Sequence, residues 1–281
     1  MNQYITVDEF KGRIALQDGD IPAVTGIIEA ASRWIDNYCH RNFYVWYGTR
    51  YFKGARNTLY IPSPFDLLSV TSLWTDPLGQ GAWPFLFAPT DFVLANVDGY
   101  DSLPYTKIYL ADCAQQRDFA PGTLRGVKIL GIWGYGDGSS RGAFPYLANG
   151  VVLPTDGLTD PATALALATG QGALFSAGTT LRIDTEDMYV PIVSGDVLTL
   201  ERGVNGTTAV AHSEGAAIYI AQYHRIVKEA CTEQSVKWWK RRESAYASKI
   251  GDQTNGIVQV YHGLDADVET MLNNSHVRRV I

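Results

Sequence analysis

The stretch DIPAVTGIIEAASRWIDNYCHRNF, from Asp20 to Phe43, decides the fold of the N-terminal part of the chain. Its apolar residues recur every three or four positions, as on one face of an α-helix of about five turns. They are Val24, Ile27, Ile28, Ala31, Trp34, Ile35 and Tyr38. Asp20 suits the N-cap, and Pro22 suits the first turn, where its missing N–H is not needed. A helix with one wide apolar stripe must bury that stripe against another element.

A second long helix is expected from Gln222 to Ile250, and it is the expected packing partner of the first. Two apolar stripes run along it, about 100° apart. One contains Val227, Ala230, Cys231, Gln234, Trp238 and Ala245, and the other contains Trp239, Tyr246 and Ile250. The helix carries seven Lys or Arg and three Glu, so positive charge is concentrated here in an otherwise acidic chain.

Short helices are expected near both ends of the chain. Thr6 and Glu9 have the spacing of a capping box, in which each residue satisfies a free backbone N–H of the other, so a helix is predicted within residues 6–16. Asp265 is the predicted N-cap of a last short helix. A strand is predicted before it, at residues 256–261.

Residues 42–135 are predicted to form an antiparallel β-sheet, because aromatic and β-branched runs alternate with Gly and Pro. Strands are expected at residues 44–52, 58–62, 67–75, 91–94, 107–110 and 127–133. The break at Gly54 predicts that the first two strands form a hairpin. The Gly-rich run Gly131–Gly138 matches no phosphate-binding motif and is expected to be a strand-ending turn.

A second β region is expected nearer the C-terminus. Residues 139–170 are poor in charge and rich in Gly, Ala, Thr and Pro, which is typical of a linker. Beyond them, short strands are predicted at residues 181–183, 188–193, 197–200 and 216–220. Their spacing of about eight to ten residues favours a small sandwich or barrel.

Composition excludes several classes of function. The net charge of −6 argues against a protein that holds nucleic acid by bulk charge. Cys39, Cys113 and Cys231 are scattered and odd in number, so we expect a reducing compartment without disulfides. We also expect no signal peptide and no membrane span, because the first residues lack the required pattern and no apolar run approaches roughly 18 residues.

No catalytic, cofactor-binding or metal-binding constellation emerges from the sequence. His212, Glu214, Asp184, Glu186 and Asp187 match no metal-ligand spacing, and we expect them to be solvated charges in surface turns. Cys39 stands beside His40, but nothing in the sequence proposes the third orienting group of a nucleophilic site. We therefore expect Cys39 to be buried for structural reasons.

The segment from Lys237 to Arg242, KWWKRR, is the sharpest local feature. One interpretation is a basic and aromatic surface that faces nucleic acid or an acidic protein. The alternative is a solvated helix face, in which Glu229, Glu233, Lys237 and Arg241 form a ladder of charges at helical spacing. Two neighbouring Trp that point about 100° apart favour a helix that contacts more than its own subunit.

Several segments carry a family resemblance, first the helix end Ala30–Phe43 and Asp66-Leu-Leu-Ser69 downstream. The others are ITVDEFKGRI near the N-terminus, the GTRYF strand, LYIPSPFDLLSVTSLWTD and TDFVL. Near the C-terminus they are the Trp238 to Arg241 spacing and GLDADV, residues 263–268. In these segments the sequence resembles the gp6-like head–tail connector proteins of tailed bacteriophages, also called adaptor or head-completion proteins. The resemblance covers roughly residues 4–136 and 222–281.

The resemblance implies a function in the virion. Such a subunit would form a dodecameric ring beneath the portal protein, close the packaged head and let double-stranded DNA pass without binding it specifically. Its C-terminal helix and tail would dock on the portal, and other surfaces would receive a stopper or tail-terminator neck protein. The location would be the neck of the virion, after assembly in the host cytoplasm. No catalysis, cofactor, metal or membrane is implied.

The expected fold is α+β, with a helical core of two long antiparallel helices plus short helices, an antiparallel β-sheet and an inserted small β-sandwich or barrel. Residues 1–145 and 222–264 would form the adaptor core, residues 146–221 the inserted module, and residues 265–281 the docking tail. The expected interface residues are Trp238, Trp239, Arg241, Arg242, Val277, Arg278, Arg279, Val280 and Ile281. An exposed tail that ends in Val277–Ile281 suits ordering on a partner.

Three alternatives remain open at this point. A tail-completion or tail-terminator ring would use the same logic but dock on tail tube protein. A carbohydrate- or receptor-binding module would need aromatic platforms within residues 173–221, which contain only Tyr189, Tyr219 and no Trp. A neck-associated hydrolase would need an acid–base pair that the sequence does not propose.

Overall fold

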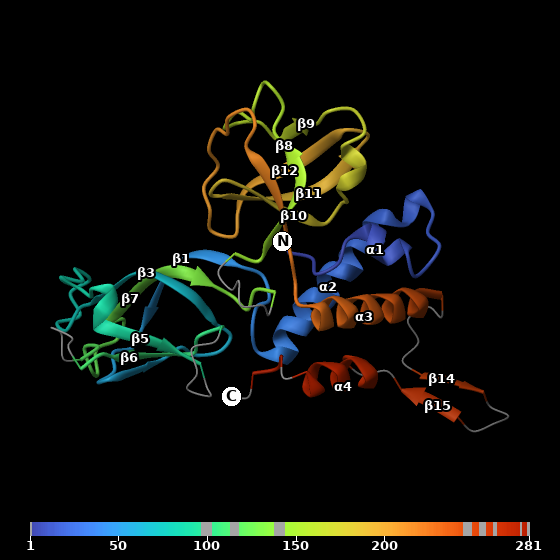
Figure 1. Cartoon of the computed structure of the whole chain (residues 1–281). Coiled ribbons are helices and arrows are strands. Elements are labelled where there is room, and N and C mark those ends of the chain that lie inside the picture. Colours follow the sequence, from blue (N-terminus) through green and yellow to red (C-terminus); the bar gives the residue numbers. More distant parts are fainter. Residues whose placement is uncertain are drawn as a thin grey trace. The chain divides into compact units, whose positions relative to one another are not determined.

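The computed structural model describes residues 2–96, 103–112, 118–137, 144–243, 249–252, 257–260, 263–275 and 277–279. The described chain is a mixed α+β protein with antiparallel sheets, as expected (Figure 1). Its helices are α1 (Val7–Lys11), α2 (Ile21–Cys39), α3 (Arg225–Glu243) and α4 (Ala266–Asn274), with short 3-10 turns at Asp18–Asp20, Pro89–Asp91 and Gly172–Leu174. Its strands are β1 (Trp46–Phe52), β2 (Thr58–Tyr60), β3 (Leu67–Thr75), β4 (Phe85–Leu86), β5 (Phe92–Ala95), β6 (Lys107–Leu110), β7 (Val127–Trp133), β8 (Tyr146–Val152), β9 (Ala164–Ala166), β10 (Thr179–Ile183), β11 (Glu186–Ser194), β12 (Val197–Val204), β13 (Ala217–Ala221), β14 (Lys249–Asp252) and β15 (Ile257–Val260).

The chain divides into two compact units. The first, called here the helical unit, contains residues 1–39, 147–204 and 209–280. The second, the sheet unit, contains residues 40–146 and 205–208. This grouping differs from the expected division of the chain, but it does not test whether residues 146–221 can fold as a module, which stays a prediction.

Helices α2 and α3 form the centre of the helical unit. The middle of the predicted stripe on α2 has no exposed surface, at Val24, Ile28, Ala31 and Ile35. On α3, Val227, Ala230 and Cys231 are equally buried. Asp20, just before α2, bonds Arg242 near the end of α3 at 3.2 Å. Ser32 Oγ, further along α2, lies 3.5 Å from Cys231 Sγ in the first half of α3. These pairs confirm the predicted antiparallel direction of the two helices.

The ends of both long helices differ from the prediction. Helix α2 ends at Cys39, because His40 takes a left-handed backbone conformation with φ of 55°. Helix α3 ends at Glu243, and the predicted extension to Ile250 is wrong, since Lys249 and Ile250 belong to strand β14. The predicted stripe residues Ala245 and Tyr246 lie outside the described residues.

The short elements follow their capping signals. Thr6 N donates to Glu9 Oε2 at 2.8 Å and Glu9 N donates to Thr6 Oγ1 at 3.2 Å, so the capping box of α1 is confirmed. Asp265 caps α4, since its Oδ1 accepts from Asp267 N at 3.0 Å. The predicted strand at residues 256–261 is β15, which pairs with β14.

The sheet unit contains a four-stranded sheet of order β1-β7-β3-β4 and a three-stranded sheet of order β2-β6-β5. The strands β3, β6 and β7 have the predicted bounds. Along β7 every second residue is buried, and Val127, Ile129 and Trp133 belong to a core cluster that also contains Phe52, Leu73 and Ile108. The side chains between them, such as Lys128, point to the opposite face.

The predicted hairpin around Gly54 is wrong. Strands β1 and β2 belong to different sheets, and each pairs with a strand much later in the sequence. Gly54 allows two chain segments to approach closely, because a Cβ atom there would lie 1.6 Å from the carbonyl oxygen of Ala120. Next to it, Ala55 forms a backbone bridge with Phe119. The glycine signal therefore marks backbone contact rather than a tight turn.

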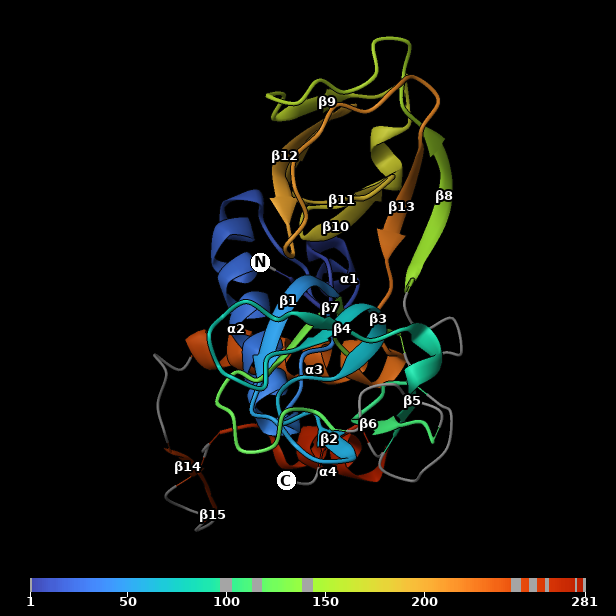
Figure 2. The ribbon, with the colours of Figure 1, turned by 90° about the vertical axis from the view of Figure 1, so that its left-hand side faces the viewer.

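A six-stranded antiparallel sheet follows, in the order β8-β13-β10-β11-β12-β9. Figure 2 shows β8 and β13, the first and last of these strands in the sequence, side by side. The prediction of a linker at residues 139–170 is wrong for the part that is described, because β8 and β9 are members of this sheet. Low charge here reflects burial, since Val151, Leu158 and Leu165 lie in its core.

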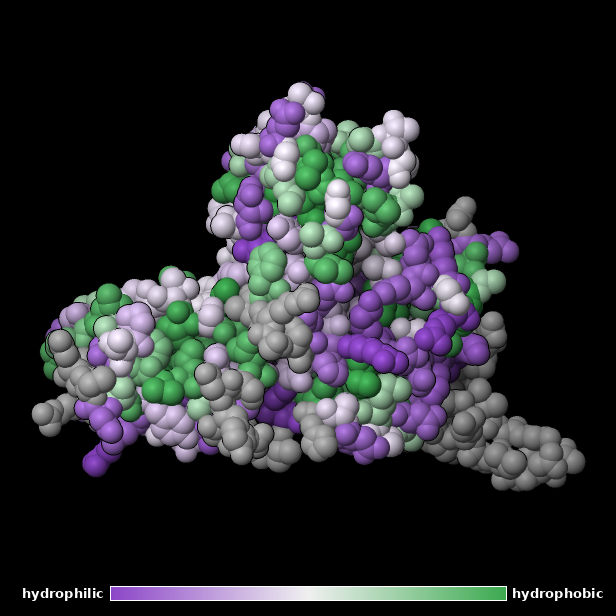
Figure 3. All heavy atoms as spheres, in the orientation of Figure 1, coloured by the Kyte–Doolittle hydropathy of each residue, from purple (hydrophilic) through white to green (hydrophobic). Residues whose placement is uncertain are grey.

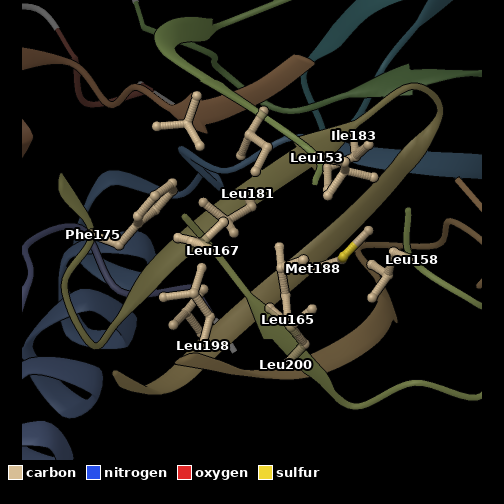
Figure 4. Close-up of a cluster of buried hydrophobic side chains, with 13 residues drawn as sticks. Leu153, Leu158, Leu165, Leu167, Phe175, Leu181, Ile183, Met188, Leu198 and Leu200 are labelled. Atoms are coloured by element: carbon tan, nitrogen blue, oxygen red, sulfur yellow. The ribbon is translucent and has the colours of Figure 1, made fainter. Parts of the chain in front are cut away.

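The core of the six-stranded sheet is a single cluster of buried side chains (Figure 4). It contains Val151, Leu153, Leu158, Leu165, Leu167, Phe175, Leu181, Ile183, Met188, Val190, Leu198, Leu200 and Ile218. Every member lies between residues 146 and 221. The sheet thus has a core made entirely of its own residues.

We predict opposite effects for alanine at two glycines. Gly54→Ala should lower the free energy of unfolding by about 1–3 kcal/mol, because the added Cβ forces the backbone at residue 120 to move. The matched variant Gly26→Ala lies in α2 with no atom within 4 Å of its new Cβ, so it should raise stability by about 0.5–1 kcal/mol. Urea unfolding followed by circular dichroism measures both, and a neutral Gly54→Ala would contradict the close approach.

Candidate protein interface on the two long helices

Two of the predicted interface residues, Trp239 and Arg242, are used inside the helical unit. Trp239 is buried, and its ring meets Phe10 of α1 edge to face at a centroid distance of 6.2 Å. The Arg242 guanidinium lies 4.3 Å from the Trp239 ring centre and bonds Asp20. These contacts hold α1 and the start of α2 on α3, so this half of the predicted surface is an internal contact.

The other Trp of the pair, Trp238, lies at the rim of a groove. Its ring meets Trp34 of α2 edge to face at 6.0 Å, and Trp34 itself is 47% exposed. The prediction that Trp34 belongs to the buried stripe is therefore wrong. The groove has a volume of about 480 Å³ and is lined by Ala23, Gly26, Ile27, Ala30, Trp238 and Arg241.

Small side chains on α2 create this groove. Ala23, Gly26, Ile27 and Ala30 follow helical spacing, so they lie on one face of α2. A Cβ added at Gly26 would meet no atom within 4 Å, which shows that the space beside it is open. Glycine within a helix costs stability relative to alanine. The site thus combines two large aromatic rings with three small residues, Ala23, Gly26 and Ala30, and one larger residue, Ile27, and it leaves room for a side chain from outside.

The charges of α3 are largely matched within the unit. Lys237 Nζ bonds Asp265, and Asp267 lies 3.4 Å away. Lys228 pairs with Glu9, and hydrophilic residues cover α1 and α3 on the side shown in Figure 3. Instead of a row of ion pairs along α3 itself, Lys228 and Lys237 form ion pairs with residues of other elements. Of the expected interface on α3, the structure leaves Trp238 and Arg241 at the groove.

The expectation of an exposed tail is wrong for the residues that are described. Val277 has no exposed surface, and neither have Val268 and Leu272 of α4. Arg279 N donates to the carbonyl of Cys39 at 2.8 Å, and the Arg278 guanidinium lies 4.5 Å from the Tyr38 ring centre. The tail is thus packed on α2 as part of the subunit. Val280 and Ile281 lie outside the described residues.

A buried ionic cluster in the six-stranded sheet was not predicted. Glu186 has no exposed surface, and its two carboxylate oxygens accept from Arg202 Nε at 2.6 Å and Arg202 Nη2 at 2.7 Å. The backbone N–H groups of Gly203 and Val210 also donate to it. Arg202 in turn donates to the carbonyls of residues 159, 160, 162 and 210. The cluster ties β11 and β12 to two loops.

His212 completes this cluster. Its Nδ1 lies 2.8 Å from Asp184 Oδ2, and its Nε2 lies 3.0 Å from Glu186 Oε2. Both ring nitrogens therefore face carboxylates. A second buried pair, Arg182 with Asp187 at 2.9 Å, lies in the same sheet. This arrangement suits a structural lock on the loops.

The interpretation of these residues as solvated turn charges is thus wrong for Glu186, Asp187 and His212, although Asp184 and Glu214 are exposed. Burial of an acid requires a cation and N–H donors, and sequence spacing did not reveal that Arg202 would meet Glu186 across β11 and β12. Within the described ranges, no group of three or more His, Cys, Asp or Glu could hold a metal ion.

The cysteine beside the helix end behaves as predicted. Cys39 has no exposed surface, which confirms its predicted burial. Cys231 is also buried, and desolvation raises the pKa of its thiol to about 11. The expected turn after β7 is present at residues 136–137, although Gly138 lies outside the described residues.

In a comparison with known proteins, no family model matches the sequence, and no curated protein matches it either. Among the helices of the described residues, none is long and apolar enough to cross a membrane. Only the contacts and the groove described above support a candidate interface on α2 and α3.

The buried cluster predicts a pH dependence of stability. Burial alone would raise the pKa of Glu186, but the donors from Arg202, Val210, His212 and Gly203 lower it to about 2. Because this folded-state pKa lies below that of an unfolded Glu, about 4.3, the stabilisation is complete above that pH and is lost as the pH falls towards 2. The loss from this group amounts to about 3 kcal/mol.

Glu186→Gln should remove this contribution and leave Arg202 buried without its partner, at a cost of about 3–5 kcal/mol at neutral pH. Urea unfolding between pH 7 and pH 3 should show a shallower acid slope for the variant than for the parent protein. Glu201→Gln, on the exposed side of β12, is the matched control and should keep the parental slope. Equal slopes for all three proteins would contradict the role of Glu186.

Proposed function

We propose that this protein is a structural head–tail adaptor of a tailed bacteriophage. Copies of it assemble into a dodecameric ring under the portal, join the capsid to the neck and tail, and leave a conduit for DNA. Its partners are the portal protein, a stopper or tail-terminator protein and other copies of itself. It acts in the virion neck, without catalysis, after assembly in the host cytoplasm.

The observation that carries this proposal is the groove between α2 and α3 with its two Trp. A ring of identical subunits uses a heterologous interface, in which a projecting group of one subunit fills a hollow on the next. Trp34 is nearly half exposed and its ring meets Trp238, which lines an open hollow of about 480 Å³ together with Arg241 and four residues of α2. Aromatic residues at such a hollow are typical of the energetic centre of a protein interface.

The charge of the chain supports a passive relation to DNA. A conduit must release double-stranded DNA, and affinity for DNA comes mainly from cations that neutralise phosphates. The chain has 29 Asp or Glu against 23 Lys or Arg. Of the basic residues on α3, Lys228, Lys237 and Arg242 are paired with carboxylates of the same unit. A tail-completion or tail-terminator ring would satisfy the same constraints and is the alternative.

The test uses the portal protein encoded by the same genome, mixed with the purified chain and imaged by electron microscopy. We expect rings of this chain on portal particles. Gly26→Leu fills the groove without a clash at Cβ and should weaken ring assembly at least tenfold, as measured by mass photometry. Asn37→Leu, which adds the same side chain to an exposed position of α2, should assemble normally.

Two outcomes would contradict the proposal. A chain that stays monomeric with portal particles present is not an adaptor, and binding to tail tube protein in place of portal would favour the tail-terminator alternative. Normal assembly of Gly26→Leu would remove the groove from the interface without deciding the function.

We also propose that residues 146–221 are a β-sandwich or barrel module inserted into the adaptor core. Its core cluster contains no residue from outside this range. Leu153, just after β8, bonds residues 215 and 216, just before β13, so the first and last strands are antiparallel neighbours. Chain ends that lie side by side are what an insertion between two existing elements requires.

The module should fold when residues 146–221 are produced alone. We expect a cooperative thermal transition and dispersed NMR signals, because the buried cluster and the Glu186–Arg202 lock are both complete within this range. Glu186→Gln in the isolated module should lower its transition temperature, whereas Glu201→Gln should not. An isolated segment without a cooperative transition would show that it needs its contacts with the rest of the helical unit.

A further inference from the structure

The outer face of the four-stranded sheet carries one complete row of side chains across all four strands. Tyr51 of β1 pairs with Lys128 of β7, Lys128 with Trp74 of β3, and Trp74 with Leu86 of β4. The flanking residues on the same strands, such as Phe52 and Leu73, are buried on the other face. Since side chains alternate along a strand, this row points away from the core.

Aromatic rings and cations are stacked along this row. Lys128 Nζ lies 4.5 Å from the Trp74 ring centre and 5.2 Å from that of Trp83. Trp83 packs on Tyr51 with 5.0 Å between ring centres. The Arg125 guanidinium lies 4.2 Å from the centre of the Tyr51 ring. We call these five residues, Tyr51, Trp74, Trp83, Arg125 and Lys128, the cation–aromatic face.

Two loops hold this face in place. Trp83 Nε1 donates to the carbonyl of Arg125 at 3.2 Å, and Thr123 Oγ1 donates to the carbonyl of Pro77 at 3.2 Å. Asp76 is buried, and its Oδ2 accepts from Gly81 N at 2.6 Å. The loop of residues 76–84 and the loop of residues 121–126 are therefore fastened to each other. Side chains held in this way lose little freedom when they bind a partner.

The loops also expose large apolar side chains beside the face. Leu78 in the first loop and Leu124 in the second are each 77% exposed, and Phe85 and Leu86 of the short edge strand β4 are exposed as well. Scattered apolar residues are normal on a surface, but a group of this kind beside three aromatic rings marks an interaction site.

The cations of the face have no acidic partner in the described part of the chain. Neither Arg125 nor Lys128 forms an ion pair there, whereas Arg182 and Arg202 are each paired with a buried carboxylate. Their positive charge meets only the faces of aromatic rings. A ring face attracts a cation but leaves its N–H groups able to bond an anion.

We propose that the cation–aromatic face binds an acidic segment of a partner protein. Carboxylates of the segment bond Arg125 and Lys128, and its apolar side chains cover Leu78, Leu124 and Leu86. Trp, Tyr and Arg are the residues that contribute most to binding energy at protein interfaces. Two cations are too few for tight binding to a nucleic-acid backbone, and exposed leucines make no favourable contact with phosphates. This proposal is independent of the adaptor function.

The experiment selects partners from a random library of displayed twelve-residue peptides against the full chain, with counter-selection on the double variant Arg125→Gln/Lys128→Gln. We expect the selected peptides to be rich in Asp and Glu next to aromatic or aliphatic residues. Fluorescence anisotropy of a labelled selected peptide should show at least tenfold weaker binding to the double variant, and binding should weaken with added salt.

Two further variants distinguish a loss of binding from a loss of folding. Leu78→Asp and Leu124→Asp lie on exposed loops, so they should leave the thermal transition unchanged, yet each should weaken peptide binding at least tenfold by repelling the acidic segment. Lys107→Gln is the matched control: Lys107 lies 5.6 Å from the exposed Tyr60 ring in the other sheet of this unit, and its loss should not change binding.

The proposal is overturned if the selected peptides lack acidic residues, or if they bind the parent protein and the double variant equally. It is also overturned if phosphatidylserine vesicles or a duplex DNA probe, but no peptide, bind the parent protein and lose affinity for the double variant. Those results would assign the face to a lipid surface or to nucleic acid instead.

Discussion

The packing of α2 against α3 is the contact around which the helices of the helical unit are arranged. Both helices have 19 residues, and the stability of a helix in a protein comes mostly from burial of its apolar face. Here that burial is complete along the middle of both helices, from Ile28 and Ile35 on one side to Val227 and Cys231 on the other. Helix α1 packs on Trp239, and Asp265, the N-cap of α4, bonds Lys237, so both short helices contact α3 as well.

The same constraint explains why the groove exists. The stripe of α2 that faces α3 carries large aliphatic residues, whereas the neighbouring face carries Ala23, Gly26 and Ala30. A helix that only had to be stable would place larger side chains or at least alanine there, because glycine weakens a helix. The small residues leave Trp34 and Trp238 accessible at the edge of the packed stripe. Burial is thus concentrated on one face of α2, and the adjacent face stays open.

The sequence predicted those features that depend on near neighbours. The capping box at Thr6, the bounds of β3 and β7, and the buried middle of α2 follow from residues within a few positions of one another. The errors concern partners that lie far apart in the sequence. Gly54 looked like a hairpin turn because its contact with Ala120 is invisible to local pattern, and residues 139–170 looked like a linker because their sheet partners come later.

The candidate sites show the same limit. The KWWKRR segment is contiguous, so it attracted attention, yet Trp239 and Arg242 close an internal contact with Phe10 and Asp20. Glu186 looked solvated because nothing local identifies Arg202 as its partner.

The cation–aromatic face passed unnoticed for the opposite reason, because Tyr51, Trp74 and Lys128 come from three strands that meet only in the folded sheet. The contact of Lys128 with its rings differs from the contact of Arg242 with Trp239 in one respect that matters for function. Arg242 lies on Trp239 with Asp20 supplying the negative charge, whereas Lys128 lies between Trp74 and Trp83 without a carboxylate among the described residues. A cation that is already held by rings and still lacks its anion loses little entropy on binding and has charge to offer.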